Sequence, residues 1–387
     1  MDLSEAESAI RDQLRRFMTT ELAPRTAAFE SGTELPYALM KKMIDELGLA
    51  MGADDIEKGV RRGPEQREGS GEMRRFLRFA ETQLMIEMCR VNPGYALSFG
   101  ASVGLFGRNV AERGTPEQAA RWVPPVLRGE KLGCWCLTEP EAGSDALGAM
   151  QATARREGDH YVLNGSKTFI TNAPHADYFL VYAKDDHGLV QAFLVERGVE
   201  GLSTSKPFPK MGMRSSPTGA VYLESVRVPV GNLLGGGIGD RDHVRKSLSS
   251  ERIGLAAMSY GIAERCFEIA VAYARTRVQG GKPIAEHQLV AGRLARMYVG
   301  LVNAHRIVYS SARGEPMTAL EASAGKLYVA EVGTAVAMDA IHVLGGNGYM
   351  DEYVVERLAR DAKLVEIGGG TTEIQLITIA RHVLAST

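Results

Sequence analysis

Residues 161–170 read Tyr-Val-Leu-Asn-Gly-Ser-Lys-Thr-Phe-Ile, and they mark a change in the character of the chain. Two short runs of β-type residues flank an Asn-Gly pair, which predicts a hairpin with its turn at Asn164-Gly165. Further β-type segments follow at 179–181, 192–195 and 221–223. Strands at this spacing are typical of a barrel or a sandwich. We therefore expect a β-domain in the middle of the chain.

The segments on both sides of this middle region have helical periodicity. Ile10, Leu14 and Phe17 mark one helical face, and the glycines at 235–237 mark the join to a second helical region. Because strands and helices do not alternate, a doubly wound sheet is disfavoured. We expect an α+β multidomain protein with a helical domain at 1–125, a β-domain, either barrel or sandwich, at 126–236 and a second helical domain at 237–387.

Composition excludes several classes of protein. The chain has 387 residues, 45% of them hydrophobic and 24% charged, which disfavours a disordered or coiled-coil protein. Its net charge of −2 gives no sign of a nucleic acid or membrane partner. Of the four cysteines only Cys134 and Cys136 lie close together, and the eight histidines are scattered, so the sequence predicts neither a disulfide framework nor a metal site. With no signal peptide or long apolar run, we expect a cytoplasmic protein.

One short motif points to a different class of enzyme. Residues 100–104, Gly-Ala-Ser-Val-Gly, fit the G-x-S-x-G motif of serine hydrolases, with Ser102 as the nucleophile. That motif needs a strand before it and a helix after it, whereas here it follows a predicted helix. We expect small-residue helix packing at Ser102 and keep a serine hydrolase as an unlikely alternative.

Longer stretches carry more information than this motif. They occur in order between about residue 130 and residue 380, and together they resemble the acyl-CoA dehydrogenase family. They are 134–145 (CWCLTEPEAGSD), 169–172 (FITN), 210–218 (KMGMRSSPT), 277–288 (RVQGGKPIAEHQ), 344–349 (LGGNGY) and 367–375 (IGGGTTEIQ).

The resemblance implies an N-terminal helical domain, a central β-barrel and a C-terminal four-helix bundle. It also implies non-covalent FAD, a homotetramer, an acyl-thioester substrate and electron transfer to electron-transfer flavoprotein. Leu137, Thr138 and Ser144 would line the flavin and phosphate region, and Phe169 and Thr171 would flank the isoalloxazine ring. The residues expected to hold the adenine dinucleotide part, some from a neighbouring subunit, are Arg277, Gln288, Gly345, Gly346 and Thr371.

The reaction needs a carboxylate base, because an acyl thioester's α-proton is only weakly acidic. Many family members place a Glu just before the final Gly-Thr, where this chain has Gly369. Isovaleryl- and long-chain-type members instead place the Glu before an Arg on the first C-terminal helix, which corresponds to Glu251-Arg252 here. We assign Glu251 as the base, with Glu366 and Glu373 as rivals. Gly369 N–H would donate to the thioester oxygen, and Arg252 would contact the CoA.

The substrate is less well defined. The resemblance places the acyl pocket near 94–105, which includes Phe99, and near Leu255. Ala96 stands where glutaryl-CoA dehydrogenases carry an Arg, which disfavours a dicarboxylate. Gly280 replaces a Phe that the family often has. Chain length stays open, as does the choice between CoA and a carrier protein. A flavin-binding protein without turnover is a further alternative.

Overall fold

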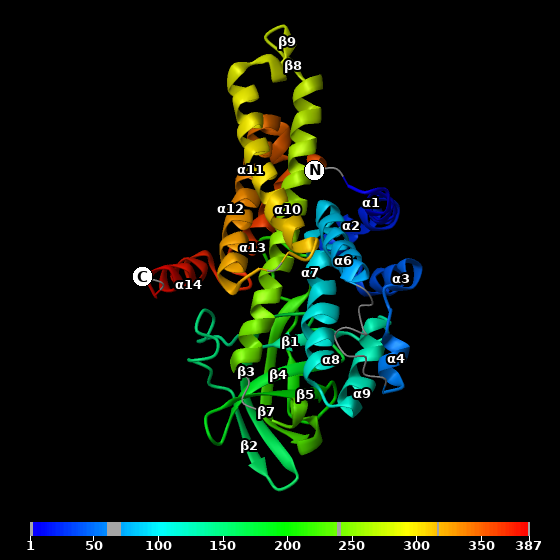
Figure 1. Ribbon diagram of the computed structural model, residues 1–387, viewed down its shortest axis with the longest axis vertical. Helices are drawn as coiled ribbons and strands as arrows, with labels where there is room; N and C mark the ends of the chain where they lie inside the picture. Colours follow the sequence, from blue (N-terminus) through cyan, green and yellow to red (C-terminus); the bar gives the residue numbers. More distant parts are fainter. Residues whose placement is uncertain (1–2, 60–70, 238–240, 316, 386–387) are drawn as a thin grey trace.

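The computed structural model describes residues 3–59, 71–237, 241–315 and 317–385 (Figure 1). The C-terminal helices form the upper part of the molecule, and the large β-sheet lies at its lower end beside several of the N-terminal helices. The N-terminal helical elements are α1 (Glu5–Phe17), η1 (Met18–Leu22), η2 (Ala23–Arg25), α2 (Thr26–Ser31), α3 (Tyr37–Leu47), α4 (Ala53–Glu57), α6 (Gly71–Val91), α7 (Pro93–Phe99), η3 (Gly100–Arg108), α8 (Asn109–Arg113) and α9 (Pro116–Leu127).

Local sequence explains where several of these helices begin. Ser4 caps α1, and its Oγ accepts from the Glu7 N–H while the Glu7 carboxylate accepts from the Ser4 N–H. The same reciprocal arrangement starts α9 at Thr115 and Gln118. Each such cap satisfies backbone donors that the first helical turn leaves unpaired.

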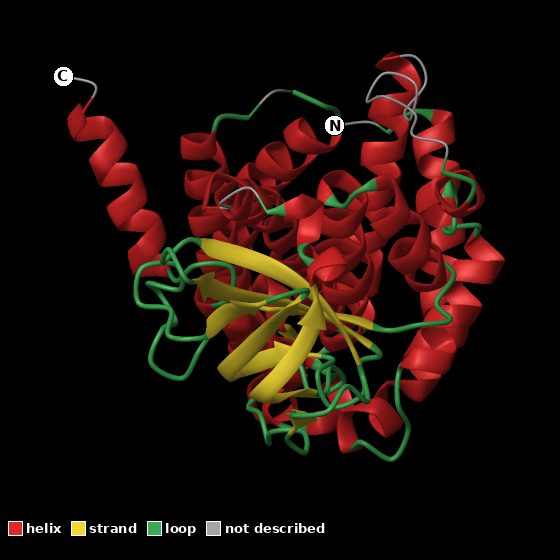
Figure 2. Cartoon of the chain, turned by 90° about the horizontal axis from the view of Figure 1, so that it is seen from below, coloured by secondary structure: helices red, strands yellow, loops and turns green. Residues whose placement is uncertain are grey.

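Within the described residues, seven strands form one curled sheet, which Figure 2 shows as a single layer against the helices. β4 is its centre, because it pairs in parallel with β1 and β2 and antiparallel with β5. The remaining order is β2, β3, β7 and β6, all antiparallel. The strands are β1 (Gly133–Cys136), β2 (Thr153–Glu157), β3 (His160–Thr171), β4 (Tyr178–Asp185), β5 (Val190–Glu196), β6 (Leu202–Thr204) and β7 (Thr218–Pro229).

The hairpin expected at Asn164-Gly165 is wrong. Both residues lie inside one continuous strand, β3, where the register with β7 shifts at a bulge. Gly165 has φ +139°, and a Cβ there would come within 2.9 Å of the Ala152 backbone. A glycine inside a strand can mark a bulge or a close backbone approach as well as a turn. The reversal instead falls at Gly158, between β2 and β3.

Apolar residues cover both faces of the sheet. One buried cluster includes Leu163, Phe179 and Val221 and covers one face of the sheet. The other joins Leu180 to Phe106 and Trp122, which come from η3 and α9. The sheet is therefore held against the N-terminal helices by a dry interface.

The C-terminal region is a helical bundle with a small hairpin at one end. Its elements after the short η4 (Val230–Asn232) and η5 (Leu234–Gly236) are α10 (Arg241–Thr276), β8 (Val278–Gln279), β9 (Lys282–Pro283), η6 (Ile284–Glu286), α11 (Gln288–Ala312), α12 (Ala319–Leu344), η7 (Gly345–Tyr349), η8 (Asp351–Tyr353), α13 (Val355–Ile367) and α14 (Thr372–Ala385). Gly280, at φ +60° between β8 and β9, occupies a left-handed turn position that disfavours a large side chain such as Phe.

α10 and α12 pack closely and run in the same direction. Ser259 Oγ donates to the Val329 carbonyl at 2.8 Å, and a Cβ on Gly333 would overlap Ser259 Oγ. In the described part of the chain, Ala319–Tyr349 alone is long and apolar enough to cross a membrane by length and composition. Its buried face packs in the bundle, which is the ordinary position of a core helix.

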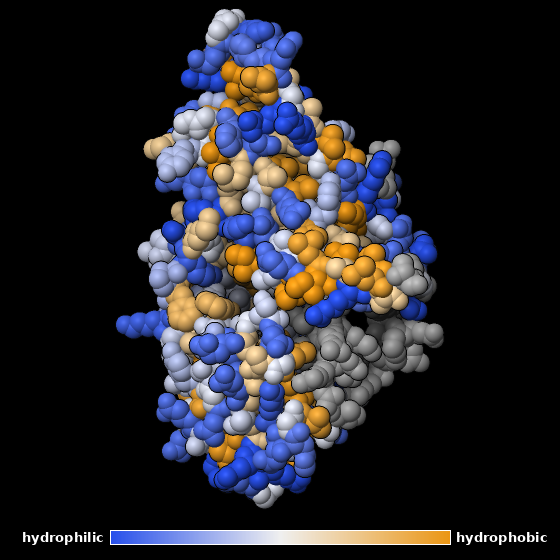
Figure 3. Space-filling view, turned by 90° about the vertical axis from the view of Figure 1, so that its left-hand side faces the viewer, coloured by the Kyte–Doolittle hydropathy of each residue, from blue (hydrophilic) through white to orange (hydrophobic). Residues whose placement is uncertain are grey.

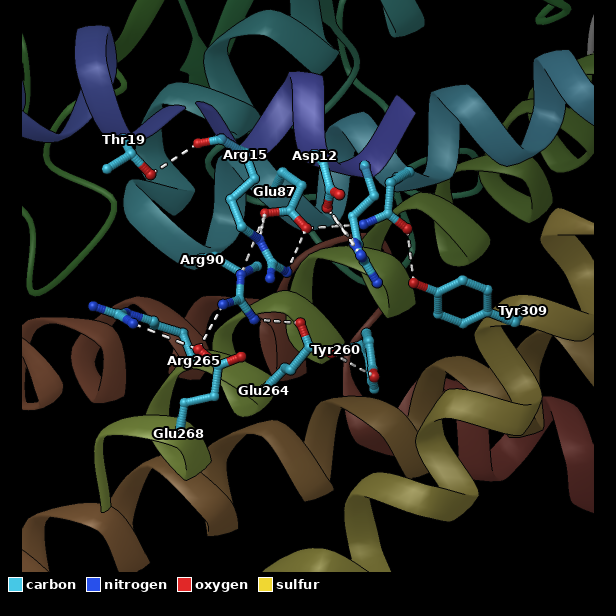
Figure 4. A network of polar contacts seen from close by, with 12 residues as sticks. Asp12, Arg15, Thr19, Glu87, Arg90, Tyr260, Glu264, Arg265, Glu268 and Tyr309 are labelled. Carbon is cyan, nitrogen blue, oxygen red and sulfur yellow. Dashed lines mark hydrogen bonds and ion pairs between the residues drawn. The ribbon is translucent and has the colours of Figure 1, made fainter. Parts of the chain in front are cut away.

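A charged network fastens α10 to the N-terminal helices (Figure 4). Glu87 on α6 is buried and accepts from Arg15 of α1 at 2.8 and 3.0 Å. Arg90, also on α6, pairs with Glu264 and Glu268 of α10. The network therefore fixes the position of the long helix that carries Glu251.

α14 projects away from the other helices (Figures 1 and 2). Figure 3 shows apolar side chains gathered at mid-height on the side from which this helix extends. Its exposed apolar residues are Leu376, Ile377, Val383 and Leu384.

Candidate active site

Glu251 lies on α10, and its Oε2 atom is buried without a hydrogen-bond partner among the described residues. Burial raises the pKa of this carboxyl to about 7, although the positive charges of Lys326 and Arg252 act to lower it. An unsatisfied carboxylate with a pKa near neutrality has the properties expected of a general base.

Gly369 lies directly beside this carboxyl. A Cβ on Gly369 would be 3.5 Å from Glu251 Cδ and only 2.3 Å from Leu255 Cδ1. Gly369 also has φ +61°, in the left-handed region. The backbone conformation and Leu255 therefore both disfavour a side chain at 369, and the Glu251 carboxyl occupies the adjacent space.

Two buried side chains that the sequence did not single out hold the turn at Gly369-Gly370. Lys326 Nζ donates to the Gly370 carbonyl at 2.8 Å. Gln375 Nε2 donates to the same carbonyl at 3.0 Å and to the Gly369 carbonyl at 3.3 Å. Neither residue lies in a portable motif, although Gln375 ends the 367–375 stretch quoted above.

The expected substrate-binding residues are not all at one place in the structure. Leu255 is buried one turn after Glu251 and contacts the Gly369 position. Arg252 points toward α12, where its Nη1 donates to Ser323 Oγ at 3.0 Å. Phe99 lines a separate cavity of about 150 Å³ together with Tyr37 and other residues of the N-terminal helices and the sheet.

The two rival carboxylates have other surroundings. Glu366 accepts from Lys363 at 2.7 Å, three residues away on α13. Glu373 is exposed in the first turn of α14, where its own backbone N–H and then the Thr371 hydroxyl lower its pKa. Neither combines burial with an unpaired oxygen beside Gly369, as Glu251 does.

One group of expected cofactor residues comes together on the sheet side. The Thr168 N–H donates to the Thr138 carbonyl at 2.9 Å, which joins β3 to the loop that follows β1. Lys167, fully buried, reinforces this joint through the Leu137 carbonyl at 3.2 Å and Glu139 at 2.8 Å.

Phe169 protrudes from this joint. It is 70% exposed and adopts φ +57°, a conformation that non-glycine residues rarely hold. Leu137 is buried, Thr138 and Thr171 are half-buried, and Ser144 is exposed. An outward aromatic ring next to hydroxyls and backbone donors fits the flat, polar-edged ring of a flavin.

A second group lies at the far end of α10. Arg277 and Asn347 line a cavity of about 690 Å³, and this places the loop of Gly345 and Gly346 near the guanidinium. Gln288 is exposed at the start of α11. These groups suit a pyrophosphate, because a guanidinium and backbone N–H groups that no side chain covers can both donate to phosphate oxygens.

The structure does not bring the two groups together within one chain. α10 is about 37 Å long from Glu251 to its end at Thr276, at 1.5 Å per residue. The sheet group lies at the lower end of the molecule, and Arg277 follows α10 at the upper end (Figure 1). Thr371 belongs to the Glu251 end, two residues after Gly369. The sheet group and the Arg277 group therefore lie towards opposite ends of the chain's structure.

Ser102 lacks the surroundings of a hydrolase nucleophile. It lies in η3, which continues α7 without an intervening strand, and it is 3% exposed. Its Oγ accepts from the Gly133 N–H at 3.0 Å, so it fastens η3 to β1. The hydrolase alternative is wrong. The small residues of the G-x-S-x-G stretch let η3 pack closely against β1, and Ser102 is buried in that contact.

Comparisons with known proteins agree along the whole chain. Residues 4–130, 134–226 and 241–384 match the N-terminal, middle and C-terminal domains of acyl-CoA dehydrogenase, respectively.

Among similar sequences, the probable acyl-CoA dehydrogenase YngJ of Bacillus subtilis (strain 168) is 37% identical over 392 residues, with 99% of both chains covered. The mitochondrial isovaleryl-CoA dehydrogenase of Pongo abelii is 34% identical over 389 residues, covering 98% of this chain and 89% of its own. Among solved structures, butyryl-CoA dehydrogenase from Megasphaera elsdenii superposes with a TM-score of 0.85 at 32% identity, covering 99% of both chains.

Proposed function

Because the chain belongs to the acyl-CoA dehydrogenase family of FAD-dependent oxidoreductases, we propose that Glu251 is the base with which it dehydrogenates an acyl-CoA between the α- and β-carbons. The observation that carries this proposal is the buried Oε2 of Glu251 next to Gly369, an oxygen to which no side chain or backbone group in the described part of the chain donates. A carboxylate without a protein partner is free to accept a proton from a substrate.

In this proposal a Glu251 carboxylate oxygen removes the α-proton. The Gly369 N–H donates to the thioester oxygen and stabilises the negative charge that develops there. Bound FAD supplies an acceptor for the hydride that leaves the β-carbon. Leu255, packed against Gly369, excludes water from the base.

The residues that would hold FAD come from two chains. Leu137, Thr138, Ser144, Phe169 and Thr171 would hold the flavin part from one subunit. The residues that would bind the rest of the cofactor from a neighbouring subunit are Arg277, Gln288, Gly345 and Gly346, whereas Thr371 lies at the Glu251 end of the bundle. The separation of the two groups and the exposed apolar face of α14 support a homo-oligomer, which we propose to be a tetramer.

The family also supports electron-transfer flavoprotein as the electron acceptor. All four cysteines are free and buried, which fits a reducing compartment such as the cytoplasm. We also propose that the chain divides into three domains, with boundaries at about residues 125 and 236.

An anaerobic visible spectrum tests the proposed reaction. Adding a saturated or branched acyl-CoA to the yellow holoenzyme is expected to bleach the flavin absorbance within seconds. The experiment is repeated with the same acyl group attached to a carrier protein. If that ester bleached the flavin faster than the CoA ester, the substrate would be the carrier-bound thioester.

The outcome separates the remaining classes of function. A colourless protein that binds no FAD would contradict the proposal. A yellow protein whose spectrum no thioester changes would point to a binding protein without turnover.

A further inference from the structure

We propose that Lys326 positions the catalytic machinery, by clamping the Gly369-Gly370 turn and by placing a positive charge near the Glu251 carboxylate. This inference rests on the proposed role of Glu251. It concerns a buried lysine on α12 that no sequence motif identified. Lys326 is 1% exposed, and a buried ammonium group needs partners that compensate for its loss of water.

The first part of the argument is the clamp. Lys326 Nζ donates to the Gly370 carbonyl at 2.8 Å and to the Glu366 carbonyl at 3.5 Å. Both carbonyls belong to the connection from α13 to α14, which contains Gly369. Glycines at φ +61° and +91° leave this turn with few restraints of its own. The lysine therefore fixes the backbone whose N–H is proposed to bind the thioester oxygen.

The second part is the placement of the charge. Ser323 lies three residues before Lys326 on α12, so their side chains share one helical face. Ser323 Oγ accepts from Arg252, which neighbours Glu251 on α10. The Lys326 face of α12 is therefore the face that meets the Glu251-Arg252 step of α10.

Burial and the surrounding charges act on both groups. Burial raises the pKa of Glu251 to about 7, while Lys326 and Arg252 act to lower it. Burial lowers the pKa of Lys326 to about 8 and Arg252 acts in the same direction, while Glu251 on α10, Glu366 on α13 and Glu373 on α14 act to raise it. At neutral pH the lysine is thus largely charged while the base is partly ionised.

The sign of the expected effect follows from these charges. The base works only when it is deprotonated, so kcat/KM rises with pH through the pKa of Glu251. Removing the Lys326 charge raises that pKa, because an ammonium close to a carboxylate favours its ionised form. The acidic limb of the profile therefore moves to higher pH, and the loss of activity is greatest below neutrality.

The test compares Lys326→Met with Gln375→Leu in the FAD-loaded enzyme. Both variants remove a donor to the Gly370 carbonyl, but only the first removes a charge. We expect Lys326→Met to move the acidic limb of kcat/KM upward by roughly one pH unit, and Gln375→Leu to lower kcat/KM by a similar factor at every pH. Lys326→Arg is expected to restore the wild-type position of the limb.

A second readout does not depend on turnover. Infrared difference spectra over a pH series, with the Glu251→Gln spectrum subtracted, report the ionisation of Glu251 in the resting holoenzyme. The titration is expected to move upward in Lys326→Met and to stay in place in Gln375→Leu. An unmoved titration in a folded Lys326→Met protein would overturn the proposal, whereas absent turnover in the wild type would count against the proposed function alone.

Discussion

At the scale of single residues, the position of the base depends on a glycine. Gly369 has φ +61°, and Leu255 Cδ1 occupies the space that a side chain there would need. The Glu251 carboxyl reaches the same region from α10. The site can therefore receive a carboxylate from position 251 on α10. A side chain at position 369 is disfavoured by the backbone conformation there and by Leu255.

This arrangement predicts the effect of a single added methyl group. Gly369→Ala places a Cβ in the left-handed region, at a cost of roughly 1–2 kcal/mol, and forces Leu255 aside. We expect kcat/KM to fall by at least about tenfold, as a displaced turn misplaces the donor to the thioester. Steady-state kinetics with a CoA ester measures this loss.

Leu255→Ala provides the matched control. In the Gly369→Ala background it removes the collision but not the strained φ, so part of the lost kcat/KM should return. If the double variant were no better than Gly369→Ala alone, Leu255 would not be the residue that closes this approach.

Sequence reasoning could nominate Glu251 as a candidate base, but it had no signal for Lys326. Glu251 precedes an Arg in a pattern that resembles isovaleryl-type enzymes, and its assignment stays a prediction. Lys326 has no such pattern, because its importance comes from a contact between α12 and a turn 44 residues later. Ser102 shows the opposite case. Its stretch matches the G-x-S-x-G motif, but the structure buries Ser102 inside a helix and does not place it between a strand and a helix.

At the scale of elements, the sequence predicted helices more reliably than strand connections. Periodicity and caps such as Ser4 act over a few neighbouring residues, so they are visible in the sequence. The continuity of β3 depends on Ala152 and β7, which pack against Gly165 from distant positions. An Asn-Gly pair alone cannot distinguish a bulge from a reversal.

The same scale explains how α10 is held. Arg90 is 7% exposed and joins α6 to α10 through Glu264 and Glu268, while Glu87 lies beside it on α6. Arg90→Met leaves the buried Glu87 with one arginine partner fewer. We expect it to lower the free energy of unfolding by roughly 3 kcal/mol, measured by denaturant unfolding of the holoenzyme.

Arg108→Met is the control for this prediction. Arg108 pairs with Glu81, but both side chains are at least half exposed. Exposed pairs contribute little, so a change within about 0.5 kcal/mol is expected. Equal losses in the two variants would mean that the α6–α10 network adds no more than an ordinary surface pair.

At the scale of the whole molecule, the helical parts and the sheet have different tasks in this account. The sheet presents Phe169 and its neighbouring hydroxyls, and the bundle carries the base near one end of α10 and Arg277 just beyond the other. Because Phe169 and Arg277 lie far apart in one chain, we propose that the cofactor site takes residues from a neighbouring chain. The order of helices, sheet and helices was predictable from periodicity, whereas this separation needed coordinates.

The most direct test of the account is exchange of the substrate's α-proton. A 3-thia-acyl-CoA has no hydrogen on the β-atom to transfer, so only the proton step can occur. In D₂O the FAD-loaded wild type and Glu366→Gln are expected to incorporate deuterium at the α-carbon, detected by mass spectrometry. Glu251→Gln is expected to lose this exchange by a factor of roughly 10² or more while it still binds FAD. Exchange at the wild-type rate in Glu251→Gln would contradict the account.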